Sequence, residues 1–170
     1  VMFLFMSHMP NFEHTDFSSV RFFIAGGSPC PKPLIAMYQK KGITFAQGYG
    51  MTETAPVIST LLPEESMKKL GSCGKPVFHL DMKIVDFDGK AVSQGETGEI
   101  LVKGPNVIRE YWRRPEETST GIVDGWLHTG DMGYLDEDGY LYIKDRRKDM
   151  YISGGENVYP AEVEDVLMGF

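Results

Sequence analysis

Apolar runs in the first part of the chain are short, and they end at turns rich in glycine or proline. Residues 21–25 form one such run, which stops at the Gly-Gly-Ser-Pro stretch of residues 26–29. This pattern predicts a buried strand followed by a tight turn. A second apolar run at residues 43–46 predicts another strand, which leads into a second glycine-containing turn at residues 47–54.

A helix is expected between these two strands. Pro31 and Pro33 favour a helix start, and the Lys-Lys-Gly stretch of residues 40–42 supplies the cations and the glycine that favour a helix end. The order strand, turn, helix, strand, turn predicts a parallel-sheet unit. Both turns then emerge at the carboxyl ends of the strands, where open α/β sheets bind ligands.

The pattern changes near residues 62–65, and short strands with closely spaced turns follow up to about residue 145. The Asp88-Gly89 and Asp138-Gly139 pairs, each flanked by apolar positions, predict hairpin turns. This region is expected to form a small twisted β-barrel or sandwich, interrupted by a short helix at residues 114–118. The predicted strands lie at residues 81–85, 98–102, 133–135 and 140–143.

The predicted fold class is therefore α/β plus β. Residues 1–70 are interpreted as the C-terminal part of a parallel α/β subdomain and residues 71–145 as the small β subdomain. Residues 146–170 are interpreted as a hinge and the start of an α+β C-terminal domain. Residues 1–6 look like the middle of a core helix, and Phe170 falls within the last predicted helix, so the chain is expected to be part of a larger protein.

Composition and charge exclude several classes of function. A hydrophobic content of 42% with 24% charged residues suits a globular domain rather than a disordered chain. The net charge of -7 argues against nucleic-acid binding driven by phosphate neutralisation. Cys30 and Cys73 are too few for a disulfide framework or a metal site, which favours reduced thiols and a cytoplasmic location. Neither a membrane-span-length apolar run nor a signal peptide is visible.

The stretch Gln-Gly-Tyr-Gly-Met-Thr-Glu-Thr at residues 47–54 carries candidate nucleotide chemistry. Its glycines lack a Cβ and can take positive φ, so backbone could approach a bulky anion closely. Thr52 can donate to a phosphate oxygen, Glu53 can hold a divalent cation and Tyr49 can offer a flat face to a base. Alone, this stretch is more typical of an ordinary strand-to-loop turn than of a nucleotide site.

Other stretches add to this picture. Residues 71–77 are glycine-rich, and residues 125–131 end with Asp131, whose carboxylate could hold vicinal ribose hydroxyls. The charged run at residues 145–149 supplies Arg146, whose planar fork could reach a sugar or a phosphate. Each of these alone is also typical of a turn, a hairpin or a solvated charge run.

Taken together and in this order, the motifs resemble the adenylate-forming superfamily of acyl-CoA synthetases, nonribosomal peptide adenylation domains and beetle luciferases. The resemblance covers essentially the whole chain. Met51 stands where peptide-synthetase domains have proline, and residues 154–162 look like those of fatty and aryl acyl-CoA synthetases. The resemblance therefore favours an acyl-CoA ligase, with a fatty acid expected as substrate.

The resemblance also implies roles for individual residues. In the family pattern, the loop of small residues at positions 26–28 lies along adenine and Tyr49 stacks on adenine. Thr52 touches the α-phosphate, and Glu53 holds magnesium. Asp131 holds the ribose hydroxyls, with Arg146 on the other side, and Lys148 lies at the hinge. The implied nucleotide and CoA site comprises Gly26, Gly27, Ser28, Gln47, Gly48, Tyr49, Gly50, Met51, Asp131, Arg146, Lys148, Gly154 and Gly155, of which the last two line the pantetheine tunnel.

The implied reaction has two steps and uses ATP, Mg²⁺ and CoA. A carboxylic acid reacts with ATP to give acyl-AMP and pyrophosphate, and the CoA thiolate then displaces AMP. No covalent enzyme nucleophile is needed, so structural roles are expected for His79, His128, Cys30 and Cys73. The family's lysine-bearing phosphate loop and its C-terminal catalytic lysine have no counterparts in residues 1–170, so these residues alone are expected to be inactive.

The alternatives remain open at this stage. One is a catalytically silent AMP-binding module, and another is an adenylation domain that transfers its acyl group to a carrier protein. A carbohydrate-binding β-domain, suggested by Trp112 and Trp126, is disfavoured because hairpin aromatics are mostly core or cross-strand residues. The sequence leaves acyl-chain length and oligomeric state undetermined.

Overall fold

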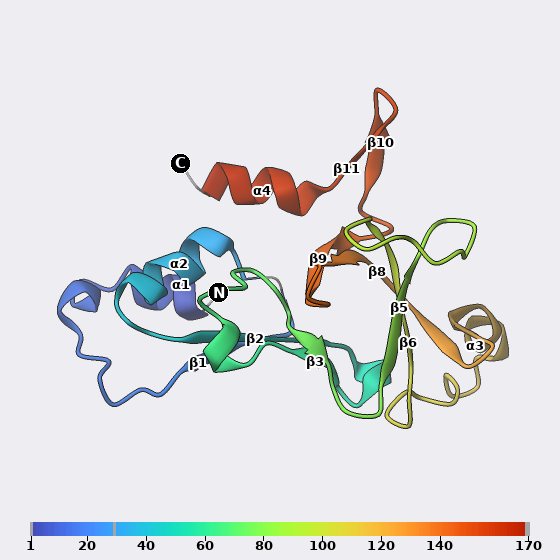
Figure 1. The fold of residues 1–170 in the computed structure, drawn as a ribbon, viewed down its shortest axis with the longest axis horizontal. Helices are drawn as coiled ribbons and strands as arrows, with labels where there is room; N and C mark the ends of the chain where they lie inside the picture. Colours follow the sequence, from blue (N-terminus) through green and yellow to red (C-terminus); the bar gives the residue numbers. More distant parts are fainter. Residues whose placement is uncertain (1, 29, 169–170) are drawn as a thin grey trace.

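The computed structural model describes residues 2–28 and 30–168, and Figure 1 shows their arrangement. The helices are α1 (Met2–Ser7), α2 (Lys32–Lys40), α3 (Pro115–Gly121) and α4 (Pro160–Met168), with 3₁₀ turns η1 (Phe12–His14), η2 (Thr52–Thr54) and η3 (Pro63–Glu65). The strands are β1 (Phe23–Ala25), β2 (Phe45–Gly50), β3 (Val57–Thr60), β4 (Lys75–Pro76), β5 (Asp81–Val85), β6 (Gly98–Lys103), β7 (Ile122–Val123), β8 (Trp126–Leu135), β9 (Leu141–Arg146), β10 (Tyr151–Ser153) and β11 (Glu156–Val158).

The first sheet has the strand order β1-β2-β3-β4. β1 and β2 are parallel, with Phe23 opposite Phe45, and α2 connects them. β3 and β4 then add antiparallel neighbours. The structure confirms the predicted strand, helix, strand unit and its parallel pairing. The expectation that Phe170 lies within a helix concerns a residue outside the described ranges.

An aromatic core holds α1 and α2 on this sheet. Leu34, Ile35 and Tyr38 of α2 are buried, and their spacing puts them on one helix face. The Tyr38 hydroxyl donates to the Phe3 carbonyl oxygen at 2.7 Å, which satisfies the polar end of a fully buried ring. The Phe3 ring lies edge-on to that of Phe45, with centroids 4.7 Å apart.

The prediction that residues 21–25 form a buried strand is wrong in two respects. The strand begins at Phe23, and the side chain of Ile24 is 58% exposed. Phe23 and Ala25 pack against the aromatic core. Because strand side chains alternate between the two faces, Ile24 points to the opposite face, where its own side chain is largely open to solvent.

The prediction of a glycine turn at residues 47–54 is also wrong in part. β2 continues through Gly50, and neither Gly48 nor Gly50 has a positive φ. A Cβ added to Gly50 would lie 1.7 Å from the backbone oxygen of Pro56. Glycine is therefore needed at this position for close approach of two backbones rather than for a turn. The chain leaves the strand only at η2.

These two glycines give the first testable prediction. Gly50→Ala forces the backbone at Pro56 to move and is expected to destabilise the protein by about 3 kcal/mol. Gly48→Ala is the matched control, because its added Cβ would lie 3.8 Å from the Ser59 oxygen, an ordinary contact distance. Denaturant unfolding of both variants measures the difference. Equal stabilities would contradict the steric explanation.

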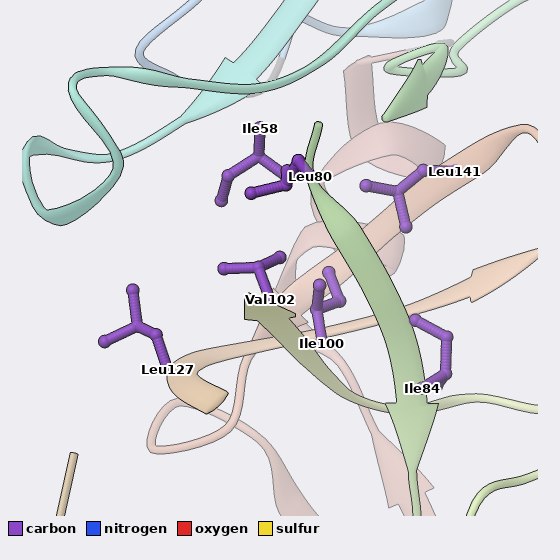
Figure 2. Close-up of a cluster of buried hydrophobic side chains, with 7 residues drawn as sticks. All are labelled: Ile58, Leu80, Ile84, Ile100, Val102, Leu127 and Leu141. Atoms are coloured by element: carbon purple, nitrogen blue, oxygen red, sulfur yellow. The ribbon is translucent and has the colours of Figure 1, made fainter. Parts of the chain in front are cut away.

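The second sheet has the strand order β5-β6-β8-β7, and β9 also pairs with β8. All of its pairings are antiparallel, as predicted for the β region. Its buried cluster also includes Ile58 of β3, so the two sheets share a core (Figure 2). An isolated bridge between Gly74 and Leu141 further joins them. The structure thus confirms the predicted combination of α/β and β architecture.

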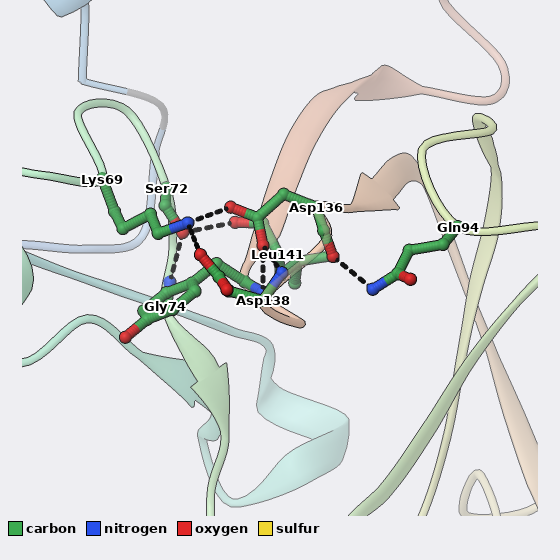
Figure 3. Close-up of polar contacts among 8 residues, drawn as sticks. Lys69, Ser72, Gly74, Gln94, Asp136, Asp138 and Leu141 are labelled. Carbon is green, nitrogen blue, oxygen red and sulfur yellow. Dashed lines mark hydrogen bonds and ion pairs between the residues drawn. The ribbon is translucent and has the colours of Figure 1, made fainter.

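A charged junction joins the turn between β8 and β9 to the segment before β4 (Figure 3). The Lys69 ammonium lies 2.8 Å from the Asp136 carboxylate and 2.5 Å from that of Asp138. Asp136 also accepts hydrogen bonds from the backbone N–H groups of Asp138 and Tyr140, which shape the predicted Asp138-Gly139 turn. The Ser72 hydroxyl donates to the Leu141 carbonyl oxygen at 2.9 Å.

The junction predicts a dependence of stability on pH. Partial burial alone would raise the pKa of Asp136, but the hydrogen bonds from Lys69, Tyr140 and Asp138 outweigh it and lower the pKa below 3.8. A carboxyl group with a lowered folded-state pKa contributes stability above its unfolded pKa and loses it as the pH falls through the folded value. The contribution of Asp136 is therefore complete above a pH of about 4 and disappears in stronger acid.

Asp136→Asn tests this dependence, because the amide oxygen can still accept both backbone bonds while the charge is lost. Thermal unfolding is expected to show that the variant is less stable than the natural protein at neutral pH, and that the gap narrows below a pH of about 4. Glu137→Gln, an exposed change in the same turn, is the control. A gap that stays constant down to acid pH would argue against the ion pair.

The last part of the chain forms an arm beyond β9 (Figure 1). β10 and β11 pair as an antiparallel hairpin, and α4 contacts β9 and α2. Lys144 pairs with Glu162, and the Ala161 N–H donates to Asp145 at 2.9 Å. The boundaries expected at residues 70 and 145 stay predictions. Within residues 2–28 and 30–168, none of the helices has the length and apolar character needed to cross a membrane.

Candidate nucleotide-binding site

Tyr49, Asp131 and Arg146 come from separate strands and meet at one place. The Tyr49 hydroxyl on β2 donates to Asp131 Oδ2 on β8 at 2.6 Å. Arg146 stands directly opposite Asp131 in the β8–β9 pairing, with its Nε 3.8 Å from Asp131 Oδ1. The sequence-based proposal requires these three residues to share one location, and the structure places them together.

Burial sets the protonation of this cluster. Burial, together with the neighbouring Asp131 charge, raises the pKa of the Tyr49 hydroxyl far above its ordinary value, so the hydroxyl keeps its proton and acts as the donor. Burial also raises the pKa of Asp131, while the Tyr49 hydrogen bond and the Arg146 charge act in the opposite direction. The result is a partly buried carboxylate with one oxygen held by Tyr49 and the other turned toward Arg146.

Thr52 and Glu53 lie on η2, just beyond the end of β2. The Thr52 side chain is exposed, while that of Glu53 is half-buried. The Tyr111 hydroxyl donates to Glu53 Oε1 at 3.1 Å, and the Ile108 N–H donates to the Glu53 carbonyl oxygen at 2.8 Å. These contacts from a distant loop orient a carboxylate next to a solvent-facing hydroxyl.

This donor set suits magnesium better than a caged metal ion. In the part of the chain that the structure describes, no group of three or more His, Cys, Asp and Glu side chains could hold a metal by itself. Magnesium usually takes one or two carboxylates and completes its shell with water and substrate phosphates. A single oriented carboxylate at Glu53 fits that pattern.

The loop that follows β1 lies against β2. A Cβ added to Gly26 would be 3.2 Å from the Gly48 carbonyl oxygen, and Gly27 has a φ of 81°. Gly26, Gly27 and Ser28 are all exposed. The structure therefore brings this loop and the Tyr49 strand side by side, with small residues where the two backbones approach.

Other predicted site residues are used differently. Gln47 is buried, and its side chain donates to the Ser72 carbonyl oxygen at 3.0 Å, which ties β2 to the loop before β4. Met51 packs against the shared core. Lys148 follows β9 in an exposed turn, and Gly154 and Gly155 form the tip of the β10–β11 hairpin, which projects from the body in Figure 1.

Two residues near the cluster escaped the sequence analysis. Tyr111 orients Glu53 from 58 residues away, and nothing in its local pattern indicates that contact. Glu99 is a carboxylate on β6 with 6% exposure. A carboxylate next to the apolar run of residues 100–102 is a signal that sequence reading could have used, because buried charges are rare unless paired.

Comparison with known proteins identifies the family of the chain. The family described as AMP-binding enzyme matches residues 1–112. The chain belongs to this family, which confirms the resemblance to adenylate-forming enzymes.

Two relatives and one solved structure illustrate the similarity. A 2-succinylbenzoate–CoA ligase of Geobacillus kaustophilus is 58% identical over 148 residues, which are 87% of this chain and 30% of that protein. A long-chain-fatty-acid–CoA ligase of Mycobacterium tuberculosis is 46% identical over 165 residues, which are 97% of this chain and 33% of that protein. O-succinylbenzoate coenzyme A synthetase of Bacillus subtilis, solved with ATP and magnesium, matches with 48% identity and a TM-score of 0.85, covering 98% of this chain and 34% of that one. The chain thus spans about a third of the length of these relatives.

The Tyr49–Asp131 contact supports a testable prediction. Tyr49→Phe keeps the ring and removes the donor from a partly buried carboxylate, so unfolding free energy is expected to fall by about 2 kcal/mol. Tyr151→Phe, at a residue that is 54% exposed, is the control and should have little effect. Denaturant unfolding compares the two variants. A Tyr49→Phe protein as stable as the control would show that the contact contributes nothing.

Proposed function

We propose that this chain supplies the adenosine-binding part of an AMP-forming acyl-CoA ligase. The observation that carries the proposal is the meeting of Tyr49, Asp131 and Arg146 from three strands, beside a strand that ends at Thr52 and Glu53. Family membership and the activities of the two relatives named above support it.

In the proposed complex, the Gly26 loop and the Tyr49 ring enclose adenine, and Asp131 accepts hydrogen bonds from the ribose hydroxyls. Arg146 approaches the same sugar from β9, opposite Asp131. A carboxylate acceptor beside a guanidinium donor can bind vicinal hydroxyls in both directions, since each hydroxyl donates and accepts. The Tyr49 hydroxyl holds Asp131 in place from the protein side.

Thr52 and Glu53 then face the phosphates. In the first step a substrate carboxylate oxygen bonds to the α-phosphorus, and the bond to pyrophosphate breaks. Negative charge grows on the phosphoryl oxygens, so positioned donors and cations supply most of the catalysis. Thr52 donates to an α-phosphate oxygen, and Glu53, oriented by Tyr111, would hold a magnesium ion, which would neutralise phosphate charge.

In the second step the CoA thiol loses its proton to water, its thiolate bonds to the acyl carbon, and the bond between the acyl carbon and the AMP oxygen breaks. No protein nucleophile takes part, and burial raises the pKa of the Cys73 thiol to about 12, which keeps it unreactive.

Lys148 is proposed as the hinge for this step, with Gly154 and Gly155 lining the pantetheine path. ATP, CoA and the reduced thiols expected from the sequence favour the cytoplasm as the location.

An aryl acid is the proposed substrate. The sequence-based expectation of a fatty acid is not confirmed, because the relatives include both kinds. The aryl-acid ligase from Geobacillus kaustophilus is 58% identical, whereas the fatty-acid ligase from Mycobacterium tuberculosis is 46% identical. The higher identity favours a compact aromatic acid over a long alkyl chain.

Pyrophosphate exchange tests the proposal in the full-length protein. We expect exchange that depends on magnesium and on 2-succinylbenzoate, followed by thioester formation when CoA is added, and weaker exchange with a long-chain fatty acid. Glu53→Gln is expected to lower kcat by about 100-fold, because a metal-holding carboxylate is lost. Glu117→Gln, which changes an exposed carboxylate on α3, is the control.

The opposing outcomes separate the alternatives. AMP binding without any pyrophosphate exchange would identify a catalytically silent module. Exchange followed by acyl transfer to a carrier protein but not to CoA would identify an adenylation domain that loads a carrier protein. Preferred activation of a long-chain acid would overturn the aryl-acid proposal while leaving the ligase class intact.

A further inference from the structure

Glu99 is the most deeply buried carboxylate near the Asp131 cluster. It lies on β6 with 6% exposure, among buried apolar neighbours. Its oxygens accept three hydrogen bonds or ion pairs: from Arg147 Nη1 at 2.9 Å, from His128 Nδ1 at 3.2 Å and from the Gly130 N–H at 3.3 Å. A buried charge is costly unless it is paired in this way, so its position needs an explanation.

The Gly130 contact comes from an irregularity in the sheet. Glu99 pairs with Met132 while Leu101 pairs with His128, so the β8 side has more residues than the β6 side at this point. Gly130 has a φ of 73° within this bulge. Bulges re-aim side chains next to functional sites and leave a backbone donor unpaired. Here the Glu99 carboxylate satisfies the Gly130 donor, one residue before Asp131.

The Arg147 contact holds the chain just beyond the end of β9. The Arg147 backbone N–H donates to the Gly130 carbonyl oxygen at 2.8 Å, and its guanidinium lies 5.1 Å from the centre of the Phe87 ring while pairing with Glu99. Arg147 follows Arg146 directly in the chain. One carboxylate therefore holds Gly130, the residue before Asp131 on β8, and Arg147, the residue after Arg146 at the end of β9.

We propose that Glu99 is a positioning residue that sets the separation and direction of Asp131 and Arg146 for binding the ribose hydroxyls. The inference rests on the proposed function, since it takes these two side chains as the ribose ligands. Glu99 touches neither nucleotide nor reacting atoms in this arrangement. It acts through the Gly130 N–H and the Arg147 guanidinium, both of which a shorter side chain would release.

The test compares ATP with 2′,3′-dideoxy-ATP, which lacks the ribose hydroxyls, in pyrophosphate exchange by the full-length protein. The ratio of kcat/KM for the two nucleotides reports the contribution of the hydroxyls. Glu99→Ala is expected to reduce this ratio by about tenfold, because two positioning bonds to a charged group are lost. A purely structural role would lower activity with both nucleotides equally and leave the ratio unchanged.

A second variant keeps the test decisive if Glu99→Ala does not fold. The Arg147 side chain is 46% exposed, so Arg147→Met should be tolerated, and it removes the other half of the same ion pair. Arg147→Met is therefore also expected to reduce the ratio of kcat/KM values. Glu99→Gln can still accept the Gly130 hydrogen bond, so it should reduce the ratio of kcat/KM values less than Glu99→Ala does. Glu137→Gln, with an exposed side chain, should leave the ratio unchanged.

The outcomes distinguish this inference from the proposed function. If the natural protein shows no exchange, or does not prefer ATP, the proposed function and this inference both fail. If the natural protein prefers ATP but folded Glu99→Ala and Arg147→Met keep the full preference, only the positioning role is overturned. A reduced ratio in both variants supports it.

Discussion

The hydrogen bond from Tyr49 to Asp131 joins two parts of the chain that are 82 residues apart, and the candidate site depends on it. It is short, partly buried and directed at a carboxylate, which makes it stronger than a bond between neutral groups. One end lies on the parallel-sheet unit and the other on the antiparallel sheet. Any relative movement of the two sheets would therefore separate the proposed adenine and ribose contacts.

The rest of the fold limits that movement. Ile58 of the first sheet is buried in the core of the second, and apolar burial of this kind has no preferred direction but resists separation (Figure 2). The Lys69 junction and the Ser72 hydrogen bond add directional contacts to the β8–β9 hairpin (Figure 3). Packing thus brings the sheets together, and polar contacts define the arrangement that places Tyr49 beside Asp131.

Local sequence patterns were sufficient to predict part of this architecture. The predicted strand at residues 81–85 coincides with β5, and the Asp138-Gly139 turn joins β8 to β9 because the Asp136 carboxylate caps that turn. Pattern could not reveal that Gly50 lies within a strand, because that requirement comes from the backbone at Pro56. Likewise, Ile24 reads as a core residue until the faces of β1 are known. Contacts such as Tyr111 with Glu53 depend on chain segments that meet only after folding.

A crystal structure of the full-length protein with AMP tests the central claim most directly. The account predicts adenine against the Tyr49 ring, and ribose hydroxyls within hydrogen-bonding distance of Asp131 and Arg146. AMP bound with its ribose away from Asp131, while the Tyr49–Asp131 bond persists, would contradict it.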